Sequence, residues 1–563
     1  MGRLPFAGDR LFLGLAIAVG VISGLAVVAF RLAIEWSRAE LLGPALNPSR
    51  QRALVVPAAA GLVVAFLVAR IFPRVRGSGV NQTKAALYIY NGYIPFRTAI
   101  GKFICCSLAI GAGHSLGPED PSLQIGAALA SSLGRRLKLS RDRLRLVAPL
   151  GAAAGLAAAF NAPVSAVLFV IEEVIGRWSA AVLGAVVLSA LSSVVVTRVF
   201  LGAQPLFRIP AIPDVKPPEL LAYAALGVAG GIAAVVFSRL IQILRPRLKA
   251  LPRWSYYLQP AVAGLLIGAM AWLGAPQVMG AGYQYIDAAI HDGYTWRMMG
   301  MLAGLKILAT TLSFTSGTPG GMFAPTLFIG AMLGGAVGGV ERLVLPHLTY
   351  SIAAYSLVGM GVLFSGFLRA PLTSVFMVVE VSQSYSIVLP LILANTIAYA
   401  ISRKLQPVPI FDMLTRQDGL ELPSLEEQRD LPALHVEDAM RPPSIPILES
   451  GELAGPAWQR VQSAAQPTLF VRFPDHCWAA IAKSELAGMA LNRPDQDLAS
   501  VLAETPGGSE PLPRLYPDHS LDVALHYLED SSVLLVVNRA DGRKLEGIIT
   551  LDDVLAAYRR TRD

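Results

Sequence analysis

The chain has 563 residues, of which 54% are hydrophobic and 15% are charged, with a formal net charge of +8 at neutral pH and a mean hydropathy of +0.53. This length would allow several soluble domains, but the hydropathy excludes a protein that is soluble throughout. Apolar segments follow one another from about Leu11 to about Ile401, and they predict a polytopic membrane protein.

Charge divides the chain into two parts. Residues 1–405 hold 33 Lys or Arg against 14 Asp or Glu, a balance of +19, whereas residues 406–563 hold 14 against 25, a balance of −11. This difference predicts a basic membrane domain over 1–405, a linker over 406–430 and an acidic soluble domain over 431–563. The basic loops would set the membrane orientation and would also attract anions, and both interpretations stay open.

The first apolar run, "LFLGLAIAVGVISGLAVVAF", begins at Leu11. It is too long for a signal peptide and lacks a small-residue cleavage site, so we expect a helix that stays in the protein. Runs of this length span a bilayer, whereas the shorter runs that Gly and Pro interrupt predict re-entrant or half-spanning helices.

The cysteines indicate no disulfide framework. Cys105 and Cys106 are adjacent in an apolar run, and Cys477 lies in the acidic part. The seven histidines show no ligand spacing, so we expect no structural metal.

The membrane part contains an internal repeat. "GPEDPSLQIGAALASSLG" (117–134) matches "GMFAPTLFIGAMLGGAVG" (321–338) at an offset of 204 residues. "NAPVSAVLFVIEEV" (161–174) matches "RAPLTSVFMVVEVS" (369–382) at an offset of 208. Two matches in one order, at nearly one offset, predict two halves with similar helices.

Each half has a predicted helix start. Gly-x-x-x-Pro precedes an apolar run at 117–121 and again at 321–325. Transporters with inverted repeats bring such helix ends together near the membrane midplane, where the halves meet; here the halves would be about 11–200 and 219–402. Helix N-termini carry unpaired N–H groups and a partial positive charge, so the arrangement favours an anion.

Three acids break the symmetry of the repeat. Glu119, Asp120 and Glu173 align with apolar residues of the other half, whereas Glu172 aligns with Glu380. We expect shared residues to be scaffold and unshared acids inside a membrane to be functional. An ionised carboxylate at an anion site would compete with the anion, and a protonated one would leave, which couples proton and anion movement. For Asp120, a simple helix-capping role is equally compatible with the sequence.

Four motifs resemble those of the CLC family of chloride channels and transporters. They are "GSGVN" (77–81), "GPEDP" (117–121), "GGMFAP" (320–325) and "FNAPVSAVLFVIEE" (160–173), and their order and spacing fit the family over about 390 residues. The resemblance implies an all-α polytopic membrane fold with inverted repeats and many tilted and broken helices. It also implies a homodimer in the lipid bilayer.

The resemblance implies an anion site built by five residues. Ser78 would donate its hydroxyl to the central anion beside Gly79, and the backbone N–H groups of Met322 and Phe323 would bind the same anion. "PVPIFDML" resembles the segment that carries the family's anion-binding Tyr, and the matching residue is Phe411. The alternative for Ser78 is a small residue in a turn.

The resemblance also implies two acids that handle protons. Glu119 matches the gating glutamate at the outer mouth, and Glu173 matches the internal proton-transfer glutamate of exchangers. The alternative for Glu173 is a cytoplasmic helix end beside Glu172.

The sequence departs from the family pattern at four positions. Pro118 replaces Arg, which removes one backbone donor and one cation, and Asp120 replaces Gly, which adds a charge beside the gate. Asn81 replaces Pro. Phe411 offers no hydroxyl, so we expect weaker anion binding at the central site.

The acidic part resembles a cystathionine-β-synthase (CBS) domain pair, a small α/β module. "LPALHVEDAMRPPSIPI" (431–447) is similar to the start of such a pair, "LEGIIT" (545–550) predicts a strand, and "LDDVLAAYRR" (551–560) predicts a helix. In nucleotide-binding examples the Asp three residues after a Thr holds a ribose, and here these residues would be Thr550 and Asp553. An adenine nucleotide is therefore a candidate ligand, and we expect no other cofactor. Helix capping by the same two residues is the alternative.

The sequence therefore predicts a chloride transporter, and no enzyme, that exchanges chloride for protons. A passive chloride channel of the same fold is the alternative, and transport of another small anion is a lesser one. The basic body and the helix ends argue against a cation transporter, and a single intramembrane Asp argues against an aspartyl protease. We expect a multi-pass protein of the bacterial inner membrane with both termini cytoplasmic and no nucleic-acid partner.

Overall fold

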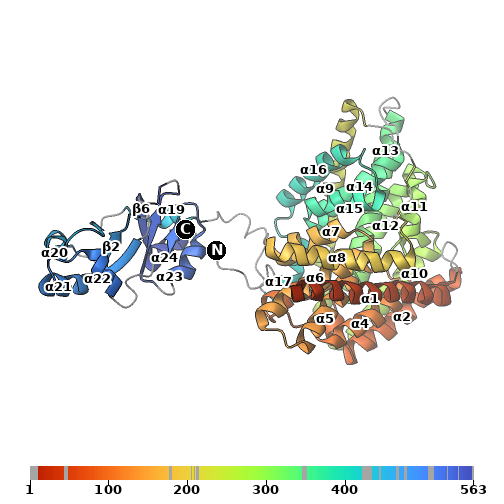
Figure 1. The fold of residues 1–563 in the computed structure, drawn as a ribbon. Helices are drawn as coiled ribbons and strands as arrows, with labels where there is room; N and C mark the ends of the chain where they lie inside the picture. The colour runs from red at the N-terminus through yellow and green to blue at the C-terminus, as the bar shows by residue number, and fades with distance from the viewer. Residues whose placement is uncertain are drawn as a thin grey trace. The chain divides into compact units, whose positions relative to one another are not determined.

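The computed structural model describes most of the chain, in two compact units that divide at residues 425 and 426 (Figure 1). Cys477 and residues 421–430 of the predicted linker lie outside the described residues. The described ranges are 10–43, 49–176, 180–204, 206–207, 209–210, 215–344, 351–420, 434–442, 446–464, 468–474, 478–504, 513–528, 531–539, 541–542 and 544–560.

The regular elements described in the first unit are helices, and they form two series in the same order. The first series is α1 (Arg10–Leu42), α2 (Arg50–Arg70), α3 (Gly79–Tyr88), α4 (Phe96–Gly111), α5 (Glu119–Arg136), α6 (Arg141–Phe160), α7 (Pro163–Phe169) and α8 (Ala180–Leu201). The second is α9 (Leu220–Lys249), α10 (Gln259–Trp272), α11 (Tyr283–Ile290), α12 (Trp296–Thr315), α13 (Phe323–Val344), α14 (Ile352–Leu368), α15 (Pro371–Ser382) and α16 (Val388–Leu405). The predicted two-repeat helical fold is confirmed.

Matching sequence signals end and begin the helices of the two series. Asn161 directly follows α6 and Arg369 directly follows α14. Both residues adopt left-handed backbone angles, with φ of 54° and 61°. In each case Ala-Pro follows, and the proline is the first residue of the next helix, where its missing N–H costs no hydrogen bond.

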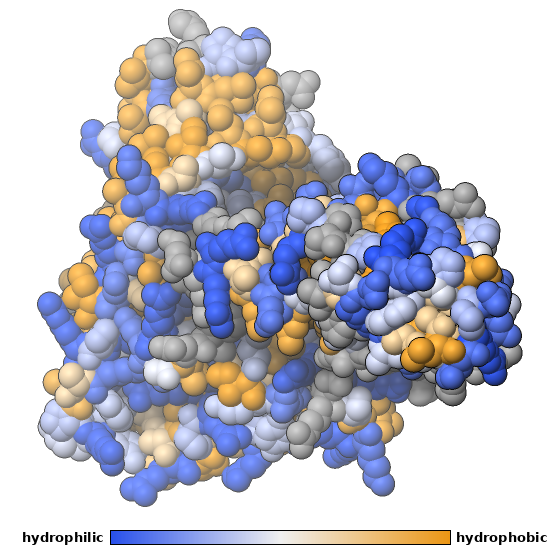
Figure 2. Space-filling model, turned by 90° about the vertical axis from the view of Figure 1, so that its left-hand side faces the viewer, coloured by the Kyte–Doolittle hydropathy of each residue, from blue (hydrophilic) through white to orange (hydrophobic). Residues whose placement is uncertain are grey.

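The membrane-spanning character follows from helix length and exposed apolar side chains. Among the described residues, eight helical segments are long and apolar enough to cross a bilayer, whereas α10, α14 and α15 are shorter. Large hydrophobic side chains are exposed on the outer helices, for example Leu25, Val195 and Val262. Figure 2 shows hydrophobic residues gathered over the upper part of the face that it presents.

Glycines bring the helices around the repeat centre into backbone contact. A Cβ atom at Gly126 of α5 would overlap the carbonyl oxygen of Gly151 in α6, and the reverse is also true. The same reciprocal contact joins Gly330 of α13 to Gly359 of α14. Small residues allow this close approach where lipid supplies no hydrophobic drive for packing.

The segment after α16 contains a further helix, α17 (Ile410–Gln417), within the first unit. Six of its eight residues, Ile410–Thr415, are buried. The region predicted as a linker from residue 406 therefore begins with an ordered part of the membrane unit, although its composition is more polar than that of the preceding helices.

The second unit contains two three-stranded sheets of the same design. β1 (Ile447–Glu449) pairs in parallel with β2 (Thr468–Arg472), which pairs antiparallel with β3 (Trp478–Ala482). β4 (Arg514–Leu515), β5 (Val533–Val537) and β6 (Leu545–Thr550) repeat this pattern. The registers place Phe470 between Ile447 and Ala480, and Leu535 between Arg514 and Ile548.

Each sheet is accompanied by helices in the same chain order. These are α20 (Ala454–Val461) and α21 (Lys483–Asn492) with the first sheet, and α23 (Leu521–Leu528) and α24 (Leu551–Arg560) with the second; α19 (Val436–Ala439) and α22 (Leu498–Glu504) flank them. The strand predicted at 545–550 and the helix predicted at 551–560 are confirmed. The first half has the same topology, and Trp478 anchors it through a buried ring whose Nε1 donates to Gly542 O at 2.9 Å.

A bulkier residue at the α5–α6 contact should destabilise the membrane unit. We expect Gly151→Val to lower the stability by about 2 kcal/mol or more, because the side chain would enter the backbone of α5. The melting temperature in detergent is measured by heating samples and quantifying the folded protein that remains by size-exclusion chromatography. Gly184→Val is the control, since a Cβ atom there meets no atom within 4 Å; equal melting points for both variants would contradict the packing argument.

Candidate ion-binding site

The two predicted helix starts lie side by side. Gly117 N donates to Gly321 O at 2.8 Å, and Gly321 N donates to Gly117 O at 2.8 Å, so the two segments run antiparallel. α5 begins two residues after Gly117 and α13 begins two residues after Gly321. The hypothesis that these N-termini meet is confirmed, and their free N–H groups concentrate positive potential in the protein interior.

Glu119 places its carboxylate on the N-terminus of the opposite repeat. The residue is fully buried, and its Oε2 accepts a hydrogen bond from Ala324 N, in the first turn of α13, at 3.2 Å. Its Oε1 has no hydrogen-bond partner among the described residues. The carboxylate thus occupies a place that the helix end would otherwise offer to a free anion.

Asp120 caps a third helix. Its Oδ1 accepts from Val80 N at 3.0 Å and its Oδ2 accepts from Ser78 Oγ at 2.9 Å, both at the start of α3. A Cβ atom at Gly79 would collide with Asp120 Oδ1, and one at Gly321 would collide with Asp120 Cβ. The neighbouring glycines therefore leave space for this side chain.

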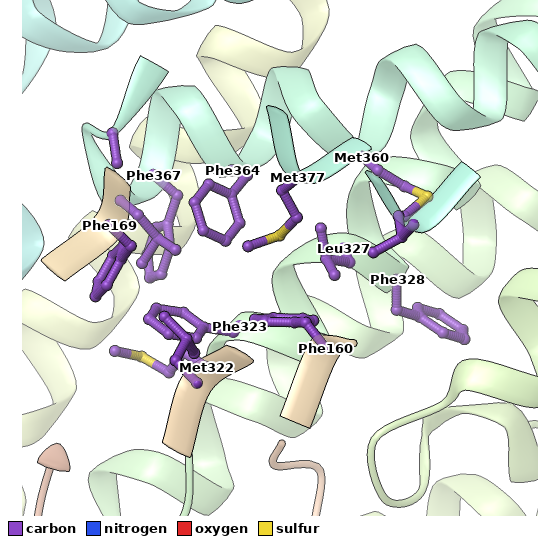
Figure 3. Close-up of a cluster of buried hydrophobic side chains, with 14 of the residues drawn as sticks. Phe160, Phe169, Met322, Phe323, Leu327, Phe328, Met360, Phe364, Phe367 and Met377 are labelled. Atoms are coloured by element: carbon purple, nitrogen blue, oxygen red, sulfur yellow. The ribbon is translucent and has the colours of Figure 1, made fainter. Parts of the chain in front are cut away.

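Aromatic rings fill the space beside the helix ends. The ring of Phe323 packs edge-on against Phe169 at a centroid distance of 4.9 Å (Figure 3). It also packs edge-on against Phe411, at 6.3 Å. Met322 is also buried. The side chains of Met322 and Phe323 therefore pack, which leaves their backbone N–H groups as the polar groups that could contact an anion.

Asn81, which replaces a proline of the family pattern, joins two helices near this cluster. Its Nδ2 donates to Phe411 O at 3.0 Å and so ties α3 to α17. A proline has no side-chain donor, so the substitution adds a bond that holds Phe411 in place.

Glu172 and Glu380, the acids that the two halves share, are structural caps. Glu172 Oε2 accepts from Thr373 N at 3.1 Å and from Thr373 Oγ1 at 2.8 Å, at the start of α15. Glu380 Oε2 accepts from Ser165 N at 2.8 Å, at the start of α7. Each repeat thus caps a helix of the other, as expected of scaffold residues.

Glu173 has a different partner, which sequence reasoning missed. It lies in a π-helical segment, η2 (Val170–Ile175), and its Oε1 is 3.4 Å from Nζ of Lys84. Lys84 Nζ also donates to Asp412 Oδ1 at 3.0 Å. Both carboxylate side chains are 9% exposed and the lysine is 1% exposed, so two acids share one buried cation. A lysine directly before the apolar run 85–90 was the signal for this group.

Two further buried lysines occupy equivalent positions in the repeats. Lys102 Nζ donates to Gly77 O at 2.8 Å, and Lys306 Nζ donates to Val278 O at 2.9 Å and Gly280 O at 2.7 Å. Each lysine ties down the loop that precedes a short helix, α3 or α11. Their shared pattern indicates a scaffold role.

A cavity of about 560 Å³ lies beside the start of α5. Its lining includes Pro118, Arg31, Arg38 and Glu35. Arg31 also interacts electrostatically with Glu119. A cavity with arginines next to the Glu119 helix end offers an anion an approach to it.

Thr550 and Asp553 form a capping box at the start of α24. Thr550 N donates to Asp553 Oδ2 at 3.0 Å, and Asp553 N donates to Thr550 Oγ1 at 3.4 Å. Arg441 Nη2 donates to the same carboxylate at 2.9 Å. The capping alternative thus has direct support, and nucleotide binding by these residues stays a prediction.

The pKa of Asp553 lies below its ordinary value. Partial burial by itself raises this pKa, but hydrogen bonds from Thr550 and Arg441 and the charge of Arg441 outweigh it. The ionised cap therefore stabilises the fold above the pKa of the unfolded chain, and this contribution is lost as pH falls through the lowered pKa.

Repeats whose helix ends meet at buried acids define a membrane transport protein of the inverted-repeat class. The family model for the voltage-gated chloride channel matches residues 60–403, and the CBS domain model matches residues 508–560. The chain is 32% identical over 446 residues to the H(+)/Cl(-) exchange transporter ClcA of Vibrio campbellii, which covers 77% of this chain and 94% of that protein.

Two more proteins are similar to the chain. The putative chloride channel protein ClcB-like of Ralstonia nicotianae is 31% identical over 425 residues, covering 73% of this chain and 99% of that protein. A crystal structure described as a slow cyanobacterial Cl-/H+ antiporter has a TM-score of 0.66 at 24% identity, covering 74% of this chain and 99% of that one. The chain belongs to the voltage-gated chloride channel (CLC) family and is a multi-pass integral membrane protein.

Removing Lys84 should destabilise the membrane unit. We expect Lys84→Met to cost roughly 3 kcal/mol, because Glu173 and Asp412 would be left buried without a cation. The readout is the unfolding midpoint in detergent. Adding Asp412→Asn to this variant should recover part of the loss, and an unchanged midpoint in Lys84→Met alone would rule out the ion pairs as a stabilising element.

Removing the Asp553 cap should loosen α24 at neutral pH. We expect Asp553→Asn to raise hydrogen–deuterium exchange of the first turn of α24 about fivefold in the full-length protein. The difference should shrink as pH falls through the lowered pKa, where the wild-type cap is also protonated. Asp552→Asn removes a charge from the same turn and serves as the control; an equal effect from both variants would show that charge alone matters.

Proposed function

We propose that this protein exchanges chloride for protons across a membrane. The observation that carries the proposal is Glu119, a buried carboxylate that accepts a hydrogen bond from Ala324 N at the N-terminal end of α13. A chloride that reached this helix end would have to displace the carboxylate, and protonation would favour that displacement. Supporting the proposal, the ClcA relative is named an H(+)/Cl(-) exchange transporter.

The proposed anion contacts come mainly from the backbone. The N–H groups of Met322 and Phe323 would bind chloride next to the place that Glu119 leaves. Phe411 contributes a ring at this place and no hydroxyl. Chloride would then be held mostly by helix-end N–H groups, which suit a small anion with no directional lone pairs.

Glu173 is the proposed second proton carrier. It lies in the π-helical segment η2, with Lys84 as its ion-pair partner. A proton that binds Glu173 would weaken this ion pair, so protonation of Glu173 would be coupled to the position of the Lys84 side chain. We also propose, from the resemblance of the sequence to the family, that the protein is a homodimer in a bacterial inner membrane with both termini cytoplasmic.

A passive chloride channel is the second candidate, because Phe411 removes a hydroxyl from the anion site and the ClcB-like relative is named a putative chloride channel protein. Looser anion binding would weaken the link between chloride and protons. The candidates differ in one observable, which is proton movement driven by chloride.

The deciding experiment is proton flux into proteoliposomes under a chloride gradient, with valinomycin and K⁺ clamping the voltage. We expect wild-type protein to move protons uphill and Glu119→Gln or Glu173→Gln to abolish this movement. Asp292→Asn, on the exposed loop after α11, is the control that should keep coupled flux. Chloride flux without proton movement in the wild type would overturn the exchanger and favour the channel.

A further inference from the structure

Asp120 is the buried acid that the proposed exchange does not use. It is 1% exposed, and it adjoins three helix starts. It stands in the first turn of α5, accepts from Ser78 Oγ and Val80 N at the start of α3, and touches Gly321 before α13. The buried Lys102 lies close by, because its Nζ donates to Gly77 O, next to Ser78, at 2.8 Å.

The donors around Asp120 are those that a bound anion would need. The Ser78 hydroxyl and the Val80 N–H group, at the N-terminus of α3, converge on its two oxygens, and the ammonium group of Lys102, bonded to Gly77 O, adds to the positive potential. The glycines at 79 and 321 give the carboxylate its space. This is an anion site whose anion is part of the chain.

The Ser78 hydroxyl cannot serve two acceptors. It has one proton, and in this structure that proton is directed at Asp120 Oδ2 at 2.9 Å. A chloride at the start of α3 would have to take this hydrogen bond from a carboxylate, which is the stronger acceptor. It would also face the negative charge of Asp120 at short range.

We propose that Asp120 is an anion built into the chain that occupies the start of α3 in place of chloride and thereby sets the chloride affinity of the pathway. The inference rests on the proposed chloride transport and deepens it. With Asp120 in place, Ser78 supports the carboxylate and chloride is bound by the helix ends of α5 and α13. Without it, the hydroxyl of Ser78 and the N–H group of Val80 turn to chloride.

The test is a double-mutant cycle on chloride binding, measured by isothermal titration calorimetry of the full-length protein in detergent. We expect Asp120→Gly to tighten the chloride dissociation constant about tenfold. Ser78→Ala should change it less than about twofold in the wild type, yet reverse most of the gain in the Asp120→Gly background. Asp292→Asn, which removes an exposed charge from the loop after α11, should change it less than about twofold.

A neutral variant of nearly the same shape guards against misfolding. Asp120→Asn keeps an acceptor for Val80 N–H and should tighten chloride binding in the same direction as Asp120→Gly. The proposal is overturned if neither folded variant tightens binding, or if Ser78→Ala weakens it equally in both backgrounds. Binding is measured without transport, so a wild type that moves no protons would refute the exchanger and leave this result intact.

Discussion

A helix that begins inside a membrane protein needs acceptors for its first N–H groups, and this requirement organises the whole membrane unit. Four carboxylates meet it. Glu119 serves α13, Asp120 serves α3, Glu172 serves α15 and Glu380 serves α7. Three of the four bonds join one repeat to the other, so the same bonds satisfy the helix ends and hold the repeats together. An acceptor that leaves such an end must be replaced, and a small anion is the natural replacement.

Comparison of the two repeats predicts that the shared acids are scaffold residues, and their contacts confirm this. Glu172 and Glu380 cap equivalent helices with equivalent bonds, and Lys102 and Lys306 fasten equivalent loops. Glu173 has no such counterpart, and it pairs with a lysine in the first repeat. The shared residues therefore form the scaffold, and the unshared acids Glu119 and Glu173 are the ones that we propose to change charge during transport.

Much of the fold could be predicted from the sequence because its signals are local or repeated. The helix starts at 117–121 and 321–325, and the strand and helix after residue 545, follow from turn residues and hydrophobic periodicity. Side-chain partners far apart in sequence could not be predicted. Lys84 and Asp412 are 328 residues apart, and the pattern around Ser78 gave no sign that its hydroxyl binds Asp120. The resemblance placed Phe411 at the anion site, but the predicted domain boundary at residue 405 left the rest of α17 outside the membrane unit.

The position of α17 has a mechanical consequence. This helix carries Phe411 and Asp412, and its end is fastened by Arg245, which bonds to Leu414 O and Asp418. It is also the last described element before the CBS tail. A displacement of the C-terminal end of α17 would first have to break the Arg245 contacts to Leu414 O and Asp418, and then the buried Lys84–Asp412 contact, before it reached Phe411. α17 would then act as a threshold element that ignores small displacements and yields to large ones.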